Sequence, residues 1–219
     1  MWRASMSYSD KIVQLIKENK IETAVELLLE AVELEPDNPL HLVNLGNLLL
    51  QHKEYEQAES FFLRALQLDE HMATAHFGLA SLHYELGKYK DAASAFRACI
   101  ALNMEDAEVY YLLGMSYLKL KNPLLASPFL QRASELEEGV DYLFQYGLTL
   151  AQLDHLTEAK KVFKRVLAID EKHADSLYNL AIIYIHEDRY DETVDLLQAT
   201  LAINPNHQLA KRALEQFER

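Results

Sequence analysis

The sequence has few of the residues that break or cross-link a chain: one Cys, six Gly and five Pro among 219 residues. A single cysteine, Cys99, excludes a disulfide framework within the chain. It falls at a small packing position of an expected helix, so we predict a buried, inert thiol. The scarcity of Gly and Pro favours helices over an all-β plan.

Long apolar runs are also absent. None approaches the roughly 20 residues of a membrane span, and the first ten residues lack the apolar core of a secretory signal. These features favour a cytoplasmic protein. Asp and Glu total 34 against 21 Lys and Arg, a net charge of −13. An acidic surface repels phosphate backbones and anionic lipid, so neither nucleic acid nor membrane is expected as a partner.

Motifs that carry catalysis are missing as well. There is no Gly-rich phosphate loop, no nucleophile elbow and no His-Glu-x-x-His motif. His76 and His83 lie on one helix face, but no acidic or Cys ligand joins them at metal-binding spacing. Paired carboxylates such as Glu137 and Glu138 are typical of solvated loops. We therefore expect no enzyme activity, no catalytic residues, no metal site and no cofactor.

What the chain does have is one pattern repeated. The segment Pro39–Met72 is typical of two short amphipathic helices joined by a turn, with Gly46 in the middle of the first helix. Because Gly costs about 1 kcal/mol relative to Ala inside a helix, its presence there predicts that another backbone passes close by. One such hairpin cannot bury its apolar faces alone, so it needs neighbours.

The same pattern recurs over almost the whole chain. Small residues of the second helix recur at spacings of 34, 34, 34, 33 and 34, namely at Ala24, Ala58, Ala92, Ala126, Ala159 and Thr193. Large residues keep the same period four positions later. This regularity predicts an all-α solenoid of antiparallel helix hairpins. The expected repeats are 5–38, 39–72, 73–106, 107–139, 140–173 and 174–207.

The two ends differ from the repeats. Residues 208–219 predict a capping helix whose apolar stripe is Leu209, Leu214 and Phe217. The first hairpin lacks the mid-helix Gly, as terminal repeats often do. Residues 1–8 are expected to form a loose tail, which leaves a single solenoid over residues 9–219.

These residues resemble the tetratricopeptide repeat family. One of the best matches to its motif is Leu42, Leu45, Gly46, Leu49, Ala58, Phe62 and Ala65. The resemblance covers about residues 5–219 and implies a right-handed superhelix whose first helices line a concave groove. It also implies a protein-interaction role.

The resemblance further implies which residues of each repeat line the groove. The fifth position holds Val43, Phe77, Tyr111, Phe144 and Tyr178. The ninth position changes along the chain from Asn47 and Ser81 to Met115, Leu148 and Ile182. We therefore expect an apolar and aromatic groove that binds a peptide or helix of a partner protein. The predicted contact residues are Phe77, Tyr84, Tyr111, Met115, Leu118, Phe144, Leu148, Tyr178, Ile182 and Ile185.

The acidic residues Glu108, Asp141 and Asp175 stand at the second positions and favour a ligand that carries basic residues. A carboxylate clamp of the kind that some family members use is not expected, since its Lys positions hold Val43 and Phe77. Two other functions stay open. One is a structural protein that self-associates into a homo-oligomer, and the other is an accessory subunit of a separate enzyme.

One repeat is irregular. Residues 107–139 number 33, and the second helix contains both Pro123 and Pro128. Asn122 can cap that helix and Pro123 can begin it. Pro128 removes the hydrogen bond to the Leu124 carbonyl and predicts a kink. Either the lost residue is absorbed in the loop at Gly139, or the superhelix changes curvature there and forms a hinge.

Overall fold

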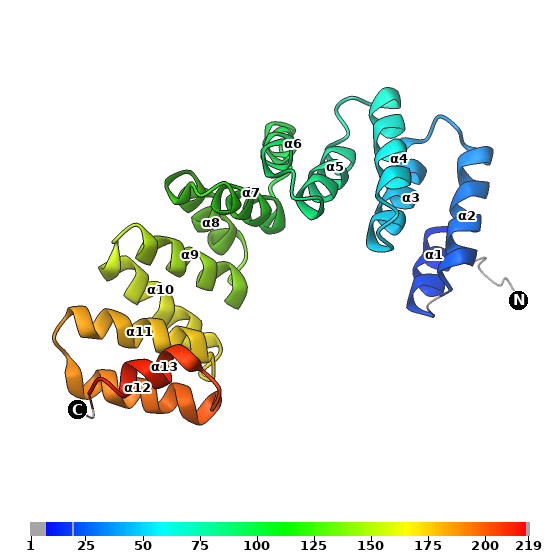
Figure 1. The fold of residues 1–219 in the computed structure, drawn as a ribbon. Helices are drawn as coiled ribbons and strands as arrows, with labels where there is room; N and C mark the ends of the chain where they lie inside the picture. Colours follow the sequence, from blue (N-terminus) through cyan, green and yellow to red (C-terminus); the bar gives the residue numbers. More distant parts are fainter. Residues whose placement is uncertain (1–7, 19, 218–219) are drawn as a thin grey trace, which may run out of the picture. The chain divides into compact units, whose positions relative to one another are not determined.

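The computed structural model describes residues 8–18 and 20–217, and they fold into helices only (Figure 1). The chain divides into two compact units, Met1–Glu105 and Asp106–Arg219. Within the described residues, the first unit contains α1 (Tyr8–Lys17), α2 (Ile21–Leu34), α3 (Pro39–Gln51), α4 (Tyr55–Leu68), α5 (Ala73–Glu85) and α6 (Tyr89–Ala101). The second contains α7 (Ala107–Lys119), α8 (Pro123–Leu136), α9 (Val140–Gln152), α10 (Leu156–Ile169), α11 (Ala174–His186), α12 (Tyr190–Ile203) and α13 (Gln208–Leu214).

Inside each unit, helices pack in the order of the sequence. The tightest pairs are α3 with α4, α5 with α6, α7 with α8, α9 with α10 and α11 with α12. Each hairpin also packs on the next one in its unit, as α4 does on α5 and α8 on α9. The predicted all-α solenoid of helix hairpins is confirmed. The continuous solenoid over residues 9–219 stays a prediction, and residues 1–7 of the predicted tail lie outside the described residues.

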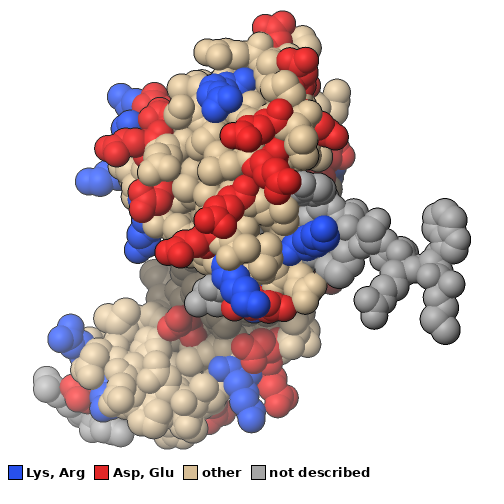
Figure 2. Space-filling view, turned by 90° about the vertical axis from the view of Figure 1, so that its right-hand side faces the viewer, with Lys and Arg blue, Asp and Glu red and all other residues tan. Residues whose placement is uncertain are grey.

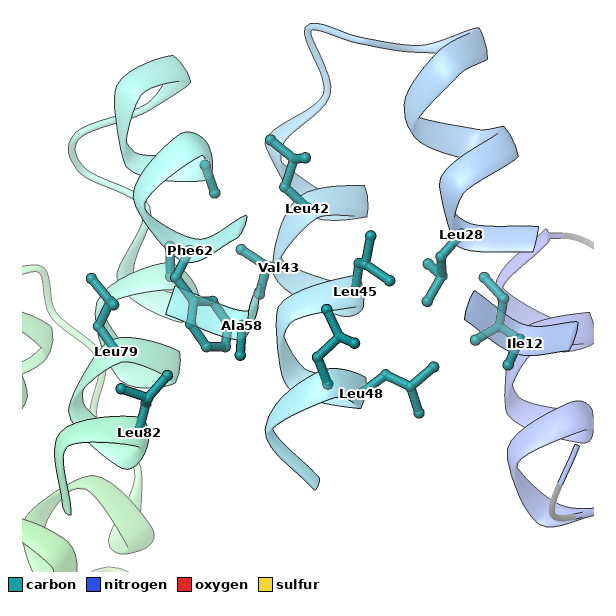
Figure 3. Close-up of a cluster of buried hydrophobic side chains, with 14 residues drawn as sticks. Ile12, Leu28, Leu42, Val43, Leu45, Leu48, Ala58, Phe62, Leu79 and Leu82 are labelled. Atoms are coloured by element: carbon teal, nitrogen blue, oxygen red, sulfur yellow. The ribbon is translucent and has the colours of Figure 1, made fainter. Parts of the chain in front are cut away.

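The core of the first unit shows how one hairpin fits the next (Figure 3). The Phe62 ring of α4 is fully buried between α3 and α5. A Cβ atom added at Gly46 would lie 2.6 Å from Phe62 Cε1, and one added at Gly78 would lie 2.3 Å from it. Side chains are excluded at both places because the ring needs the space. The sequence predicted that another backbone passes close to Gly46. That prediction was wrong, because the close neighbour is the Phe62 ring.

The second unit repeats this arrangement with other residues. A Cβ at Gly114 would lie 2.6 Å from Leu130 Cγ, and a Cβ at Gly147 would lie 2.8 Å from Phe163 Cε1. Leu130 and Phe163 are fully buried. The mid-helix glycines thus mark the positions where the large residue of the second helix meets the first helix.

Hairpin turns share one backbone conformation. Positive φ angles occur once in each turn of the second to sixth hairpins, at Lys53 (63°), Gly87 (72°), Lys121 (57°), Asp154 (63°) and Asp188 (56°). Residues with a Cβ carry a cost of roughly 1–2 kcal/mol in this left-handed conformation, and Gly does not.

The irregular repeat keeps its helix lengths. Asn122 caps α8 by accepting a hydrogen bond from the Leu125 amide (3.2 Å), and α8 is one helix with Pro128 inside it. Only Glu137, Glu138 and Gly139 connect α8 to α9, whereas the four residues 69–72 connect α4 to α5. The missing residue therefore falls in the loop, as the first of the two interpretations has it. A change of curvature at Gly139 stays a hypothesis.

The C-terminal helix caps the last hairpin, with one correction. Ala210 is fully buried, and Leu214 and Phe217 pack against the cluster formed with Ala181 and Leu197. Leu209, predicted to belong to the apolar stripe, is 54% exposed. The neighbouring Ala210 packs against the last hairpin instead, because its small side chain lets α13 lie close to that hairpin. In residues 8–18 and 20–217, no helix has the length and apolar character needed to cross a membrane.

Candidate partner-binding surface

In the second unit, the first helix of each hairpin carries large apolar residues at i and i+4, and α7 and α11 carry another at i+7, so these lie on one helix face. All are half-buried, neither hidden in the core nor fully solvated. We call this set the apolar strip, and its members are Tyr111, Met115, Leu118, Phe144, Leu148, Tyr178, Ile182 and Ile185. Eight of the ten predicted contact residues thus share one kind of environment on α7, α9 and α11.

Each fifth-position ring of the strip is covered by an aromatic ring from further along the chain. Tyr142 lies on Tyr111 with ring centroids 5.1 Å apart. His173 lies 4.7 Å from Phe144, and His207 lies 4.8 Å from Tyr178. These contacts join α7 to α9, α9 to the start of α11, and α11 to the start of α13. Such tilted aromatic pairs stabilise by about 0.5–1.5 kcal/mol beyond their burial.

The two histidines have a second role as helix caps. His173 Nδ1 accepts a hydrogen bond from the Ser176 amide, and His207 Nδ1 accepts one from the Ala210 amide, each at 3.1 Å. An accepting Nδ1 leaves the proton of the neutral ring on Nε2. The Nε2 of His207 donates to Asp175 Oδ1 at 3.1 Å. The two histidine rings that cover Phe144 and Tyr178 are therefore held by hydrogen bonds as well as by packing.

Sequence reasoning did not identify Tyr142, His173 and His207 as contacts of the strip. The available signal was that each histidine directly precedes a helix, where a side-chain acceptor is favoured. Of the three ring contacts, only the one that Tyr142 makes belongs to a helix without a cap side chain. The helix start there is Gly139, which has no side-chain cap hydrogen bond.

Acidic side chains border the strip. Glu108, Asp141 and Asp175 are exposed in the first turns of α7, α9 and α11. The pKa of Tyr142 is raised, first by burial and then by nearby carboxylates that include Glu137 and Glu108. Burial also raises the pKa of Tyr178. Both phenols therefore stay neutral donors beside an apolar surface with acidic edges.

The remaining two predicted contact residues belong to the first unit. Phe77 and Tyr84 lie on α5 and are half-buried. Phe77 contacts the Phe96 ring edge-on (5.9 Å), and Tyr84 contacts Tyr89 in the same way (5.5 Å). Val43, expected to line the groove at the equivalent position, is only 1% exposed. That part of the expectation was wrong, because Val43 packs in the core of the first unit (Figure 3).

The described residues contain no group of three or more His, Cys, Asp or Glu side chains that could hold a metal ion. Cys99 is fully buried, its Sγ lies 3.6 Å from the Ala73 carbonyl oxygen, and burial raises its pKa to about 12. The prediction of a buried thiol is confirmed, and a thiol with this pKa is a poor nucleophile.

Curated relatives match most of the chain. It is 26% identical to anaphase-promoting complex subunit 3 of Schizosaccharomyces pombe over 178 residues, 81% of this chain and 27% of that protein. It is 24% identical to the human protein O-mannosyl-transferase TMTC3 over 196 residues, 87% of this chain and 21% of that protein. The chain thus spans about a quarter of the length of these relatives.

Two solved structures match over nearly all of their own length. YrrB, described as a TPR protein with an unusual peptide-binding site, is 34% identical with a TM-score of 0.81, over 87% of this chain and 99% of YrrB. PilF of Pseudomonas aeruginosa shares the fold with a TM-score of 0.79 at 17% identity, over 97% of this chain and 96% of PilF. Profiles of the tetratricopeptide repeat match residues 37–105, 77–136 and 150–217. This protein therefore belongs to the tetratricopeptide repeat family.

Proposed function

We propose that this protein is a non-enzymatic interaction scaffold whose apolar strip binds a peptide or helix of a partner protein. The observation that carries the proposal is the half-buried state of all eight strip residues on α7, α9 and α11. A set of partly exposed apolar side chains on neighbouring hairpins is a liability unless a ligand covers it. The peptide-binding site named for YrrB, 34% identical, supports the same class of function.

The ligand chemistry follows from the side chains. Met115 is flexible and polarisable, so it adapts to the shape of an apolar ligand. Leu148 and Ile182 repeat the apolar character at the same position of the next two hairpins. An amphipathic helix or an extended apolar peptide suits such a surface. The exposed acids Glu108, Asp141 and Asp175 favour basic residues at the edges of that ligand.

The test replaces Met115, Leu148 and Ile182 together by Asn, the residue that the second hairpin has at this position as Asn47. The matched control replaces Leu124, Leu125 and Ile169, which are exposed on second helices of the same unit, also by Asn. Partners captured from native lysate are identified by mass spectrometry, and circular dichroism verifies the fold. Partners should be lost from the strip variant and retained by the control. Equal recovery by both folded variants would overturn the proposal.

A further inference from the structure

A second groove lies in the first unit, on elements that the apolar strip does not use. It is a cavity of 560 Å³ between the first turns of α2 and the last turn of α3. Leu48 and Leu49 form its buried floor, and the half-buried Ile21 and Val25 form one wall. All four side chains are aliphatic, so the groove suits apolar side chains of a ligand.

Polar side chains line the groove beside this apolar floor, namely three carboxylates and the exposed His52. Glu22 and Glu26 follow the α2 wall, and Glu54 lies opposite, in the turn before α4. All three are exposed, and Glu54 does not cap α4 with its side chain. Figure 2, which looks onto the side of the first unit where α2 lies, shows Asp and Glu side chains gathered in a band.

Some carboxylates of the chain are neutralised by nearby cations. Glu18 pairs with Lys20, and Glu187 pairs with Lys160 and Arg189. In contrast, Glu22, Glu26 and Glu54 form no ion pair with any described residue. Because Glu22 and Glu26 are four residues apart on one helix, they also repel each other. A ligand that brings cations would remove this repulsion.

One wall residue of the groove differs from the residue that three other hairpins have at its position. The first residue of the second helix is Tyr in the second, third and sixth hairpins, at Tyr55, Tyr89 and Tyr190. The first hairpin has Ile21 at this position. The shorter side chain leaves space beside the floor that a Tyr ring would take up.

We propose that this groove is a second docking site, for an amphipathic segment of a partner protein that places apolar side chains on Leu48 and Leu49 and Lys or Arg beside Glu22, Glu26 and Glu54. Charge complementarity selects this occupant. An acidic or purely apolar segment would leave the three carboxylates unpaired or desolvated. The site is separate from the proposed function, since it shares no residue with the apolar strip.

The test measures binding of the full chain to a fluorescein-labelled helical peptide made of Leu and Lys, with Leu on one face, by fluorescence anisotropy. The comparison peptide has Glu in place of Lys. The double variant Glu22→Gln/Glu26→Gln should bind the Leu/Lys peptide roughly fivefold more weakly, as expected for two solvent-exposed ion pairs. The matched control is Glu30→Gln/Glu33→Gln, which makes the same charge change on the same helix outside the groove.

Ile21→Tyr tests the apolar part with a residue that the chain itself uses at this position, so the fold should be retained. It should weaken binding while leaving all carboxylates in place. The apolar strip suits the same peptide, so these measurements are also made with Asn at Met115, Leu148 and Ile182. In that background Glu22→Gln/Glu26→Gln and Ile21→Tyr should still weaken the remaining binding, which separates this site from the strip.

Three outcomes would overturn the proposal. The two double variants could lose affinity equally, or the Glu peptide could bind as well as the Lys peptide. Light scattering could also detect a dimer that only Glu22→Gln/Glu26→Gln removes and that the peptide does not displace. In that case the occupant would be a second copy of the chain.

Discussion

His207 lies against Tyr178 with ring centroids 4.8 Å apart while its Nδ1 accepts the amide hydrogen of Ala210. One side chain thus holds a ring of the apolar strip and the start of α13. His173 does the same for Phe144 and the start of α11. The geometry of the strip therefore depends on residues outside it.

We expect His173→Ala and His207→Ala each to lower the free energy of unfolding by about 1–2 kcal/mol, since each removes a helix cap and a ring contact. Urea unfolding followed by circular dichroism measures this. His173→Asn keeps a capping acceptor and should recover part of the loss. His71→Ala, whose side chain is 76% exposed, serves as the control and should change little. A loss as large for His71 as for His173 would contradict the capping role.

Gly78→Ala should destabilise the protein, although Ala is the better helix former by about 1 kcal/mol. The added Cβ would lie 2.3 Å from Phe62 Cε1, and overpacking of this kind costs about 1–3 kcal/mol. Because the gain in helix propensity offsets part of this cost, a net loss of up to roughly 2 kcal/mol is expected in urea unfolding. A smaller side chain at position 62 tests whether the clash is the cause. In the Phe62→Leu variant, Gly78→Ala should cost less than it does in the unmodified chain. Strict additivity would argue against the clash.

The hairpin turns offer a stabilising change. Lys53→Gly and Lys121→Gly should each raise the free energy of unfolding by about 1 kcal/mol, because both residues have positive φ angles that Gly adopts without a Cβ clash. Gly87→Ala should lower it by a similar amount. Thermal unfolding of the three variants measures the pattern. Destabilisation by Lys53→Gly would mean that its side chain supports the turn in some other way.

Cys99 should resist thiol reagents in the native protein. Its pKa is raised from 9.0 to about 12, so the thiolate fraction near neutral pH falls roughly a thousandfold. The raised pKa favours the folded state below pH 9, and this contribution is lost as the pH rises from 9 toward 12. Titration with Ellman's reagent should detect no rapid reaction in buffer and one thiol in guanidinium chloride. Rapid reaction of the folded chain would show that the thiol is accessible.

The hairpins could be predicted from the sequence because their packing contacts repeat. Ala58 and Phe62 recur in kind every 34 or 33 residues, and each such pair occupies the same place in its hairpin. Val43 shows where this reasoning fails. The repeat register assigned it to a groove, but its neighbours bury it, and burial depends on the sizes of surrounding side chains rather than on register.

The strip residues could likewise be placed on one helix face from spacing alone. Their support by Tyr142, His173 and His207 could not, because these residues occupy a helix interior in one case and cap positions in the others. A contact that is made in two different ways leaves no single periodic signal. The groove beside Ile21 was missed for the related reason that it arises from a departure from the repeat.

The burial of Phe62 between Gly46 and Gly78 has a consequence for how the first unit opens. The ring belongs to the second hairpin, yet one of its faces is covered only while the third hairpin is folded. Opening α5 would expose Phe62 and weaken α3 and α4 as well. Amide hydrogens of these neighbouring hairpins should therefore exchange with solvent as one cooperative block, in which no hairpin melts alone.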